Sequence, residues 1–129
     1  MDIQMKKGLL EACILRVVED EPSYGYKIIG DISKYIEVSE STLYPILKRL
    51  ETATCLNTFT KEYNGRLRKY YEITATGLQR IQYFKEEWPQ IKNVYEFILK
   101  EKFEPKPPEK IATSEVLNNT SKENNQNNN

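Results

Sequence analysis

Two runs of strand-forming residues, 56–63 and 66–73, are separated by Asn64-Gly65. An Asn-Gly pair between such runs is the strongest short-range signal for a β-hairpin, because a type I′ turn needs positive φ at both central residues. The chain therefore has to accommodate an antiparallel hairpin near its middle, and the other elements have to be arranged around it.

The two-residue turn also sets the register of this hairpin. It places Phe59 opposite Tyr70, Thr58 opposite Tyr71 on the other face, and Lys61 opposite Arg68. Like charges that face each other destabilise an isolated hairpin slightly. A polyanion that neutralises Lys61 and Arg68 would explain why both are present.

Two amphipathic helices are predicted in the first part of the chain. The first has apolar residues at helical spacing and stops at the acidic stretch 19–21 and Pro22. Ser23 is a suitable N-cap for the second. We attribute Gly25 and Gly30, which weaken a helix, to the close approach of a neighbouring helix. The apolar sets are Leu10, Cys13, Ile14, Val17 and Val18, then Ile28, Ile29, Ile32, Tyr35 and Ile36.

A third helix is predicted directly before the hairpin, with Ser39 or Ser41 as its N-cap. It buries one apolar face, and Pro45 predicts a bent or irregular start because proline lacks a backbone donor. Three helices followed by a two-stranded wing have the order of a winged helix-turn-helix. The inward set is Leu43, Ile46, Leu47 and Leu50.

A long fourth helix is predicted from its cap at Thr74, and Pro89 should kink it near 85–88. From Phe84 onward its apolar residues have coiled-coil spacing. A short core cannot cover such a stripe, so we expect it to pack against a second subunit, the alternative being that it folds back on its own domain. The expected dimer interface comprises Leu9, Leu10, Phe84, Trp88, Ile91, Tyr95 and Ile98.

These elements give a mainly α fold with a small β-hairpin: a winged helix-turn-helix plus a long C-terminal dimerisation helix. The expected domains are 1–74 for the winged helix, 75–103 for the dimerisation helix and 104–129 for a Pro- and Asn-rich tail. The tail has too little apolar surface to offset the entropy cost of ordering, so we expect it to be disordered.

Composition excludes several classes of function. The chain has no histidine and two cysteines, which argues against zinc sites and against most hydrolase mechanisms. We expect buried structural thiols at Cys13 and Cys55, and no enzyme activity, cofactor or metal. No apolar run approaches the roughly 20 residues that span a bilayer, and the start is not a secretory signal, so we expect a cytoplasmic protein without membrane contact.

The formal net charge is zero, but the charges are unevenly distributed. Residues 1–40 carry five basic and eight acidic side chains, whereas residues 41–72 carry six basic and three acidic ones. A local basic surface is what the phosphate backbone of DNA requires.

The outer face of the third helix is polar and basic, which suits the major groove of DNA. We expect Ser41, Thr42 and Tyr44 to approach bases or flanking phosphates, with Lys48 and Arg49 on the backbone. On the wing, Lys61, Arg66, Arg68 and Lys69 could enter a minor groove or lie on phosphates.

Four motifs occur in a fixed order along the chain: Tyr24-Gly25-Tyr26, the stretch 41–51 (STLYPILKRLE), Gly65-Arg66 with the stretch 68–71 (RKYY), and Thr74 with Gly77. In these motifs, and from about Leu9 to Leu99, the sequence resembles the PadR family. It differs at Ser41, preceded by Glu40, where the family commonly has glycine.

The resemblance implies a winged-helix dimer, usually a repressor, whose DNA affinity falls when a hydrophobic or aromatic molecule binds. It adds Tyr24 to the expected DNA-binding residues. The short C-terminal region is similar to the small subfamily with a single C-terminal helix, in which Trp88 matches a tryptophan at the dimer interface. Trp88 is thus a candidate ligand contact, the alternative being plain dimer core.

The leading hypothesis is a repressor that binds an inverted repeat of double-stranded DNA as a homodimer and is released by a hydrophobic effector. The half-sites would lie about 34–36 Å apart. One alternative is a DNA-organising or plasmid-partition adaptor that coats DNA and recruits a partner through its tail. Another is a protein-interaction module that has lost DNA binding.

Overall fold

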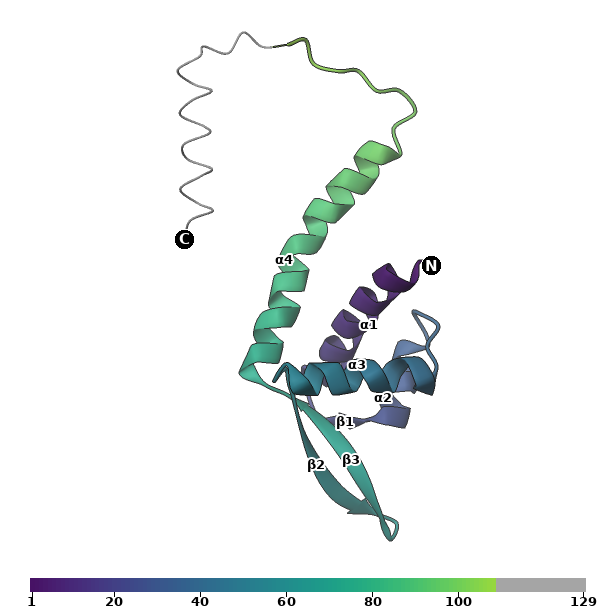
Figure 1. The fold of residues 1–129 in the computed structure, drawn as a ribbon, viewed down its shortest axis with the longest axis vertical. Coiled ribbons are helices and arrows are strands. Elements are labelled where there is room, and N and C mark those ends of the chain that lie inside the picture. Colours follow the sequence, from purple (N-terminus) through teal and green to yellow (C-terminus); the bar gives the residue numbers. More distant parts are fainter. Residues whose placement is uncertain (109–129) are drawn as a thin grey trace. The chain divides into compact units, whose positions relative to one another are not determined.

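The computed structural model describes residues 1–108 (Figure 1). The chain divides into two compact units, Met1–Glu96 and Phe97–Asn129. Residues 109–129, most of the predicted tail, lie outside the described residues. The elements in order are α1 (Ile3–Val18), β1 (Ser23–Tyr24), α2 (Gly25–Ile32), α3 (Glu40–Thr52), β2 (Leu56–Tyr63), β3 (Arg66–Ile73) and α4 (Ala75–Ile98).

Helices α1, α2 and α3 meet in one hydrophobic core. Leu10, Ile14, Ile28, Leu43 and Leu47 are all fully buried there. Burial of one such side chain contributes roughly 1.5–3 kcal/mol, so the apolar faces predicted from helical spacing hold the three helices together.

Helix α3 carries the predicted inward face, since all four of its expected core residues are buried. Its first turn begins where the carbonyl of Ser39 accepts from the amide of Leu43, at 2.9 Å. The helix is continuous from Glu40 to Thr52 and includes Pro45.

The hairpin has the predicted turn and register. Asn64 and Gly65 have φ of 50° and 78°, as a type I′ turn requires. Lys61 lies opposite Arg68, Phe59 opposite Tyr70 and Thr58 opposite Tyr71. The prediction made from Asn64-Gly65 is confirmed.

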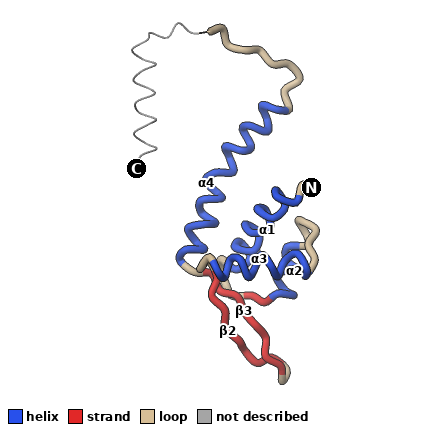
Figure 2. The backbone as a smooth tube through the Cα atoms, in the orientation of Figure 1, coloured by secondary structure: helices blue, strands red, loops and turns tan. Residues whose placement is uncertain are grey.

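A third strand was not foreseen. In Figure 2 the strands form one small sheet, in which β3 lies between β1 and β2. Ser23 pairs with Tyr71, and Tyr24 pairs with Tyr70. The prediction that Ser23 caps the second helix was therefore wrong, because its backbone is extended along β3 and Tyr24 is the residue that precedes α2.

Helix α2 is shorter than predicted and ends at Ile32. The amides of Tyr35 and Ile36 both donate to the carbonyl of Ile32, which closes the helix with a turn. This turn directs Tyr35 to solvent, with 86% of its surface exposed, so its placement in the apolar set was wrong. Ile36 packs against the core as expected.

Helix α4 is joined tightly to the base of the hairpin. The Thr74 hydroxyl accepts from the amide of Gly77 at 3.0 Å, which confirms the predicted cap, and donates to the carbonyl of Thr54 at 2.6 Å. Ile81 adds to the core of the three preceding helices. The helix continues through Pro89 and ends at Ile98, before the expected boundary at 103.

Among residues 1–108, no helix combines the length and the apolar character that crossing a bilayer would demand.

Two glycines give a matched test of the joint between the hairpin and α4. A Cβ on Gly77 would overlap the carbonyl of Cys55, whereas a Cβ on Gly30 would meet no atom within 4 Å. We expect Gly77→Ala to lower the free energy of unfolding by about 1–3 kcal/mol, as overpacking does. Gly30→Ala should raise it by roughly 0.5–1 kcal/mol, because alanine restricts the unfolded chain. Urea denaturation measures both, and equal effects would contradict the tight joint.

Candidate nucleic-acid interface

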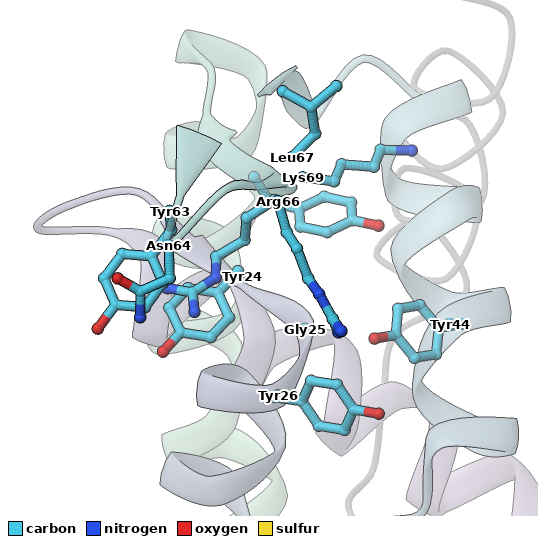
Figure 3. A pocket seen from close by; sticks show the side chains of 11 residues that line it. Tyr24, Gly25, Tyr26, Tyr44, Tyr63, Asn64, Arg66, Leu67 and Lys69 are labelled. Carbon is cyan, nitrogen blue, oxygen red and sulfur yellow. The ribbon is translucent and has the colours of Figure 1, made fainter. Parts of the chain in front are cut away.

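A hollow of about 510 Å³ lies between the start of α2, the start of α3 and the tip of the hairpin (Figure 3). Five tyrosines and three basic residues are among the side chains that line it. It brings together five residues that the sequence predicted for DNA binding: Tyr24, Tyr44, Arg66, Arg68 and Lys69.

Arg68 is held between two tyrosine rings. Its guanidinium carbon lies 3.9 Å from the ring centre of Tyr24 and 4.0 Å from that of Tyr63. Tyr24 packs edge-on against Tyr70, with ring centres 5.6 Å apart, and Phe59 stacks on the same tyrosine at 5.3 Å. Because cation–π and aromatic contacts fix both orientation and position, this row of side chains anchors the wing to the start of α2.

The opposite face of β3 is turned toward α3. Lys69 pairs with Glu51 at 3.6 Å and lies over the ring of Tyr71, 5.4 Å from its centre. The Thr58 hydroxyl donates to the same glutamate at 3.5 Å. Burial raises the pKa of Tyr71, which remains a neutral hydrogen-bonding group at neutral pH.

Tyr44 joins α3 to α2. Its hydroxyl occupies the space where a Cβ on Gly25 would lie, so this glycine permits a close approach, as predicted. The same explanation was wrong for Gly30, which has open space around it. One turn further along α3, Lys48 lines a second depression together with Tyr44 and Lys69.

The hydroxyls at the start of α3 interact with one another. Ser39 Oγ lies 3.0 Å from Ser41 Oγ and 3.2 Å from Thr42 Oγ1. Ser39 makes no side-chain cap bond to the helix. Ser41 is exposed, so its proposed approach to bases is sterically open, whereas Thr42 is half-buried.

Arg49 is directed away from this surface. Its guanidinium donates to Glu11 of α1 at 3.2 Å, and Arg80 of α4 donates to the other oxygen of Glu11 at 2.8 Å. Arg49 lines neither of the two depressions at this surface, and its contact with the DNA backbone stays a prediction.

Sequence reasoning did not assign six of the residues that line this hollow to the site: Gly25, Tyr26, Tyr63, Asn64, Leu67 and Tyr71. In Figure 3 the hydroxyls of Tyr26 and Tyr44 lie at the same end of the hollow. The hydrogen-bonding and charge interaction with Glu40 raises the pKa of Tyr26. Tyr63 could have been predicted as a site residue from the sequence, because it directly precedes the turn and the hairpin register places it opposite Arg66.

A second hollow, of about 380 Å³ and almost wholly apolar, lies between α1, α2 and the first half of α4. Leu9, Phe84 and Trp88, three of the expected interface residues, line it. Trp88 stacks on Phe84 with ring centres 5.4 Å apart. Cys13 also lines this hollow and is half-buried, which raises its pKa, whereas Cys55 is fully buried.

The remaining expected interface residues differ in exposure. Leu10 is fully buried in the core of its own domain, which leaves no surface for a second subunit, so its assignment to the interface was wrong. Ile91, Tyr95 and Ile98 are 51%, 57% and 68% exposed. In the part of the chain that the structure describes, no group of three or more potential metal ligands occurs.

Three helices, a β-hairpin wing and a basic, tyrosine-rich hollow between wing and third helix define a winged-helix DNA-binding protein. Residues 14–83 match the transcriptional regulator PadR-like family. The chain belongs to this family.

The chain is also similar to individual proteins. A solved structure from Streptococcus mutans UA159 is 41% identical, with a TM-score of 0.67 over 76% of this chain and 92% of that one. A PadR-like transcriptional regulator from Bacillus cereus strain ATCC 14579 is 34% identical, with a TM-score of 0.67 over 77% of this chain and 99% of that one. An uncharacterised protein from Lysinibacillus sphaericus is 30% identical over 98 residues, which are 72% of this chain and 90% of that protein.

Proposed function

We propose that this transcriptional regulator is a repressor that binds an inverted-repeat operator as a homodimer. Helix α3 would lie in the major groove, with the wing on the adjacent backbone or minor groove. The observation that carries the proposal is the hollow, which gathers Arg66, Arg68 and Lys69 next to Tyr44 of α3.

The charges on this surface support contact with phosphates. Within residues 1–108, Lys48, Lys61 and Arg66 form no salt bridge, so their charges are free to interact with a polyanion. Neutralising a phosphate releases condensed counterions, which favours binding at low salt. We propose no catalytic activity of its own, and we place the protein in the cytoplasm because its proposed partner is chromosomal DNA.

The first test concerns the wing. We expect Arg66→Ala to weaken binding to a duplex from the region upstream of the protein's own gene. It should also reduce the slope of log K against log salt by about one, the value for one lost phosphate contact. Gel-shift titrations at several salt concentrations measure both quantities.

Arg16→Ala is the matched control. It removes the same charge from α1, where Arg16 is already paired with Glu19 and Asp20. Its affinity and slope should equal those of the wild type. An unchanged slope for Arg66→Ala would remove the wing from the interface, and footprints that spread beyond one palindrome would favour the DNA-organising alternative.

Dimerisation is proposed through the exposed apolar residues of α4. Ile91 and Tyr95 lie one turn apart and are both more than half exposed, at 51% and 57%. A helix that leaves such residues in water gains stability when a second apolar surface covers them.

We therefore expect Ile91→Glu to convert the dimer to a monomer in size-exclusion chromatography with light scattering, because it places a charge in the apolar contact. Gln90→Glu adds the same charge at the neighbouring exposed position and should remain dimeric. A monomeric wild type, or an Ile91→Glu variant that stays dimeric, would refute this interface.

An effector site is proposed at the apolar hollow next to Trp88. A planar apolar molecule could stack on Trp88 while Leu9 and Phe84 exclude water. Trp88 is the single tryptophan of the chain, so its fluorescence reports directly on this site.

We expect the dye 8-anilinonaphthalene-1-sulfonate to quench Trp88 and to weaken DNA binding. Trp88→Ala should abolish the effect on DNA while the dimer persists in size-exclusion chromatography. Tyr83→Ala, at an exposed position of the same helix, is the control and should keep the full response. A response that survives Trp88→Ala would place the effector elsewhere.

A further inference from the structure

Glu40 is an acidic residue on a surface otherwise suited to a polyanion. It is the first residue of α3 and is exposed. Helical spacing places it on the same face as Tyr44 and Lys48, four and eight residues further on. In helix-turn-helix proteins the first residues of this helix contact the base edges, so Glu40 occupies the end of the face that reaches deepest into the groove.

Tyr26 of α2 lies beside this carboxylate and links it to the hollow. The interaction with Glu40 raises the pKa of the Tyr26 hydroxyl, and Tyr26 itself lines the hollow with Tyr44. Because Glu40 shares a face of α3 with Tyr44 and Lys48, which line the two depressions, its carboxylate lies on the side of the helix that carries the proposed DNA surface.

Electrostatics alone do not favour a carboxylate here. The positive end of the α3 dipole stabilises an acidic residue in the first turn, but the effect is modest and is screened by salt. The phosphates of a bound duplex repel the same carboxylate. A compensating interaction with DNA would resolve this conflict.

The chemistry of the major groove offers one such interaction. An ionised carboxylate only accepts hydrogen bonds. Cytosine presents its N4 amino donor there, whereas guanine presents two acceptors, thymine an acceptor and a methyl group, and adenine an amino donor beside the N7 acceptor. Cytosine is the base edge that a glutamate fits without facing a second acceptor.

We propose that Glu40 determines specificity by selecting a cytosine in each half-site, with its carboxylate accepting from the N4 amino group. This inference rests on the proposed function, since it requires α3 to enter the major groove.

Selection of random-sequence duplex DNA by the full chain tests the inference. The wild type should enrich a motif with one strongly preferred cytosine per half-site. Glu40→Ala should enrich the same motif with that position degenerate, and the wild type's preference for cytosine there, roughly 5- to 100-fold, should disappear. Glu40→Gln should shift the preference toward adenine, because an amide pairs with adenine N6 and N7.

Glu37→Ala is the matched control, since it removes the same charge from an exposed residue before α3. It should leave the enriched motif unchanged. A structural role of Glu40 would lower thermal stability without moving base preference, and the shift toward adenine separates the two roles.

Identical motifs for the wild type and both Glu40 variants would overturn the inference and leave the proposed function intact. Loss of all binding in both variants would also overturn it, because reading one base pair accounts only for the stated fold-change. If the wild type enriches no motif and binds no duplex, the proposed function itself fails.

Discussion

The pairing of β3 with strands on both of its sides is the constraint on which the interface depends. β2 alone would give a wing attached only at its base, but β1 ties Tyr70 and Tyr71 of β3 to the two residues that precede α2. Backbone hydrogen bonds thereby place Tyr24 where its ring can stack on Arg68. Strand pairing and aromatic contacts thus join the wing to the helix-turn-helix before any duplex is bound, which lowers the cost of ordering these side chains on binding.

The basic excess of residues 41–72 is distributed among three environments. Arg49 and Lys69 are paired with carboxylates of α1 and α3. Arg68 lies between the rings of Tyr24 and Tyr63, which stabilise its guanidinium opposite Lys61 without removing its charge. Lys48, Lys61 and Arg66 form no salt bridge within residues 1–108, so they remain available for phosphates. Counting charges along the sequence identified the segment that supplies the basic residues of the hollow, but not which of its charges are paired with carboxylates.

How far the sequence predicted this structure depended on the range of each interaction. Asn64-Gly65 determined the hairpin register because turn geometry and the two-residue period of a strand act locally. The buried faces of α1 and α3 followed from helical spacing in the same way. β1 could not be predicted, since two residues show no periodicity and Ser23 also fits a cap. The pairing of Arg49 with Glu11 could not be predicted either, because the two residues are 38 positions apart and no local pattern connects them.

The close seating of Gly77 on the carbonyl of Cys55 bears on how DNA spacing would be measured. The Thr74 hydroxyl also donates to the carbonyl of Thr54, in the loop between α3 and β2, so the start of α4 is fixed to the base of the hairpin at two points. In a dimer joined through α4, such short connections would fix the distance and the orientation between the two DNA-binding domains. Inserting a single base pair between half-sites rotates one about the duplex axis by roughly a tenth of a turn. Two DNA-binding domains held at a fixed spacing would accommodate that rotation only by deforming the DNA.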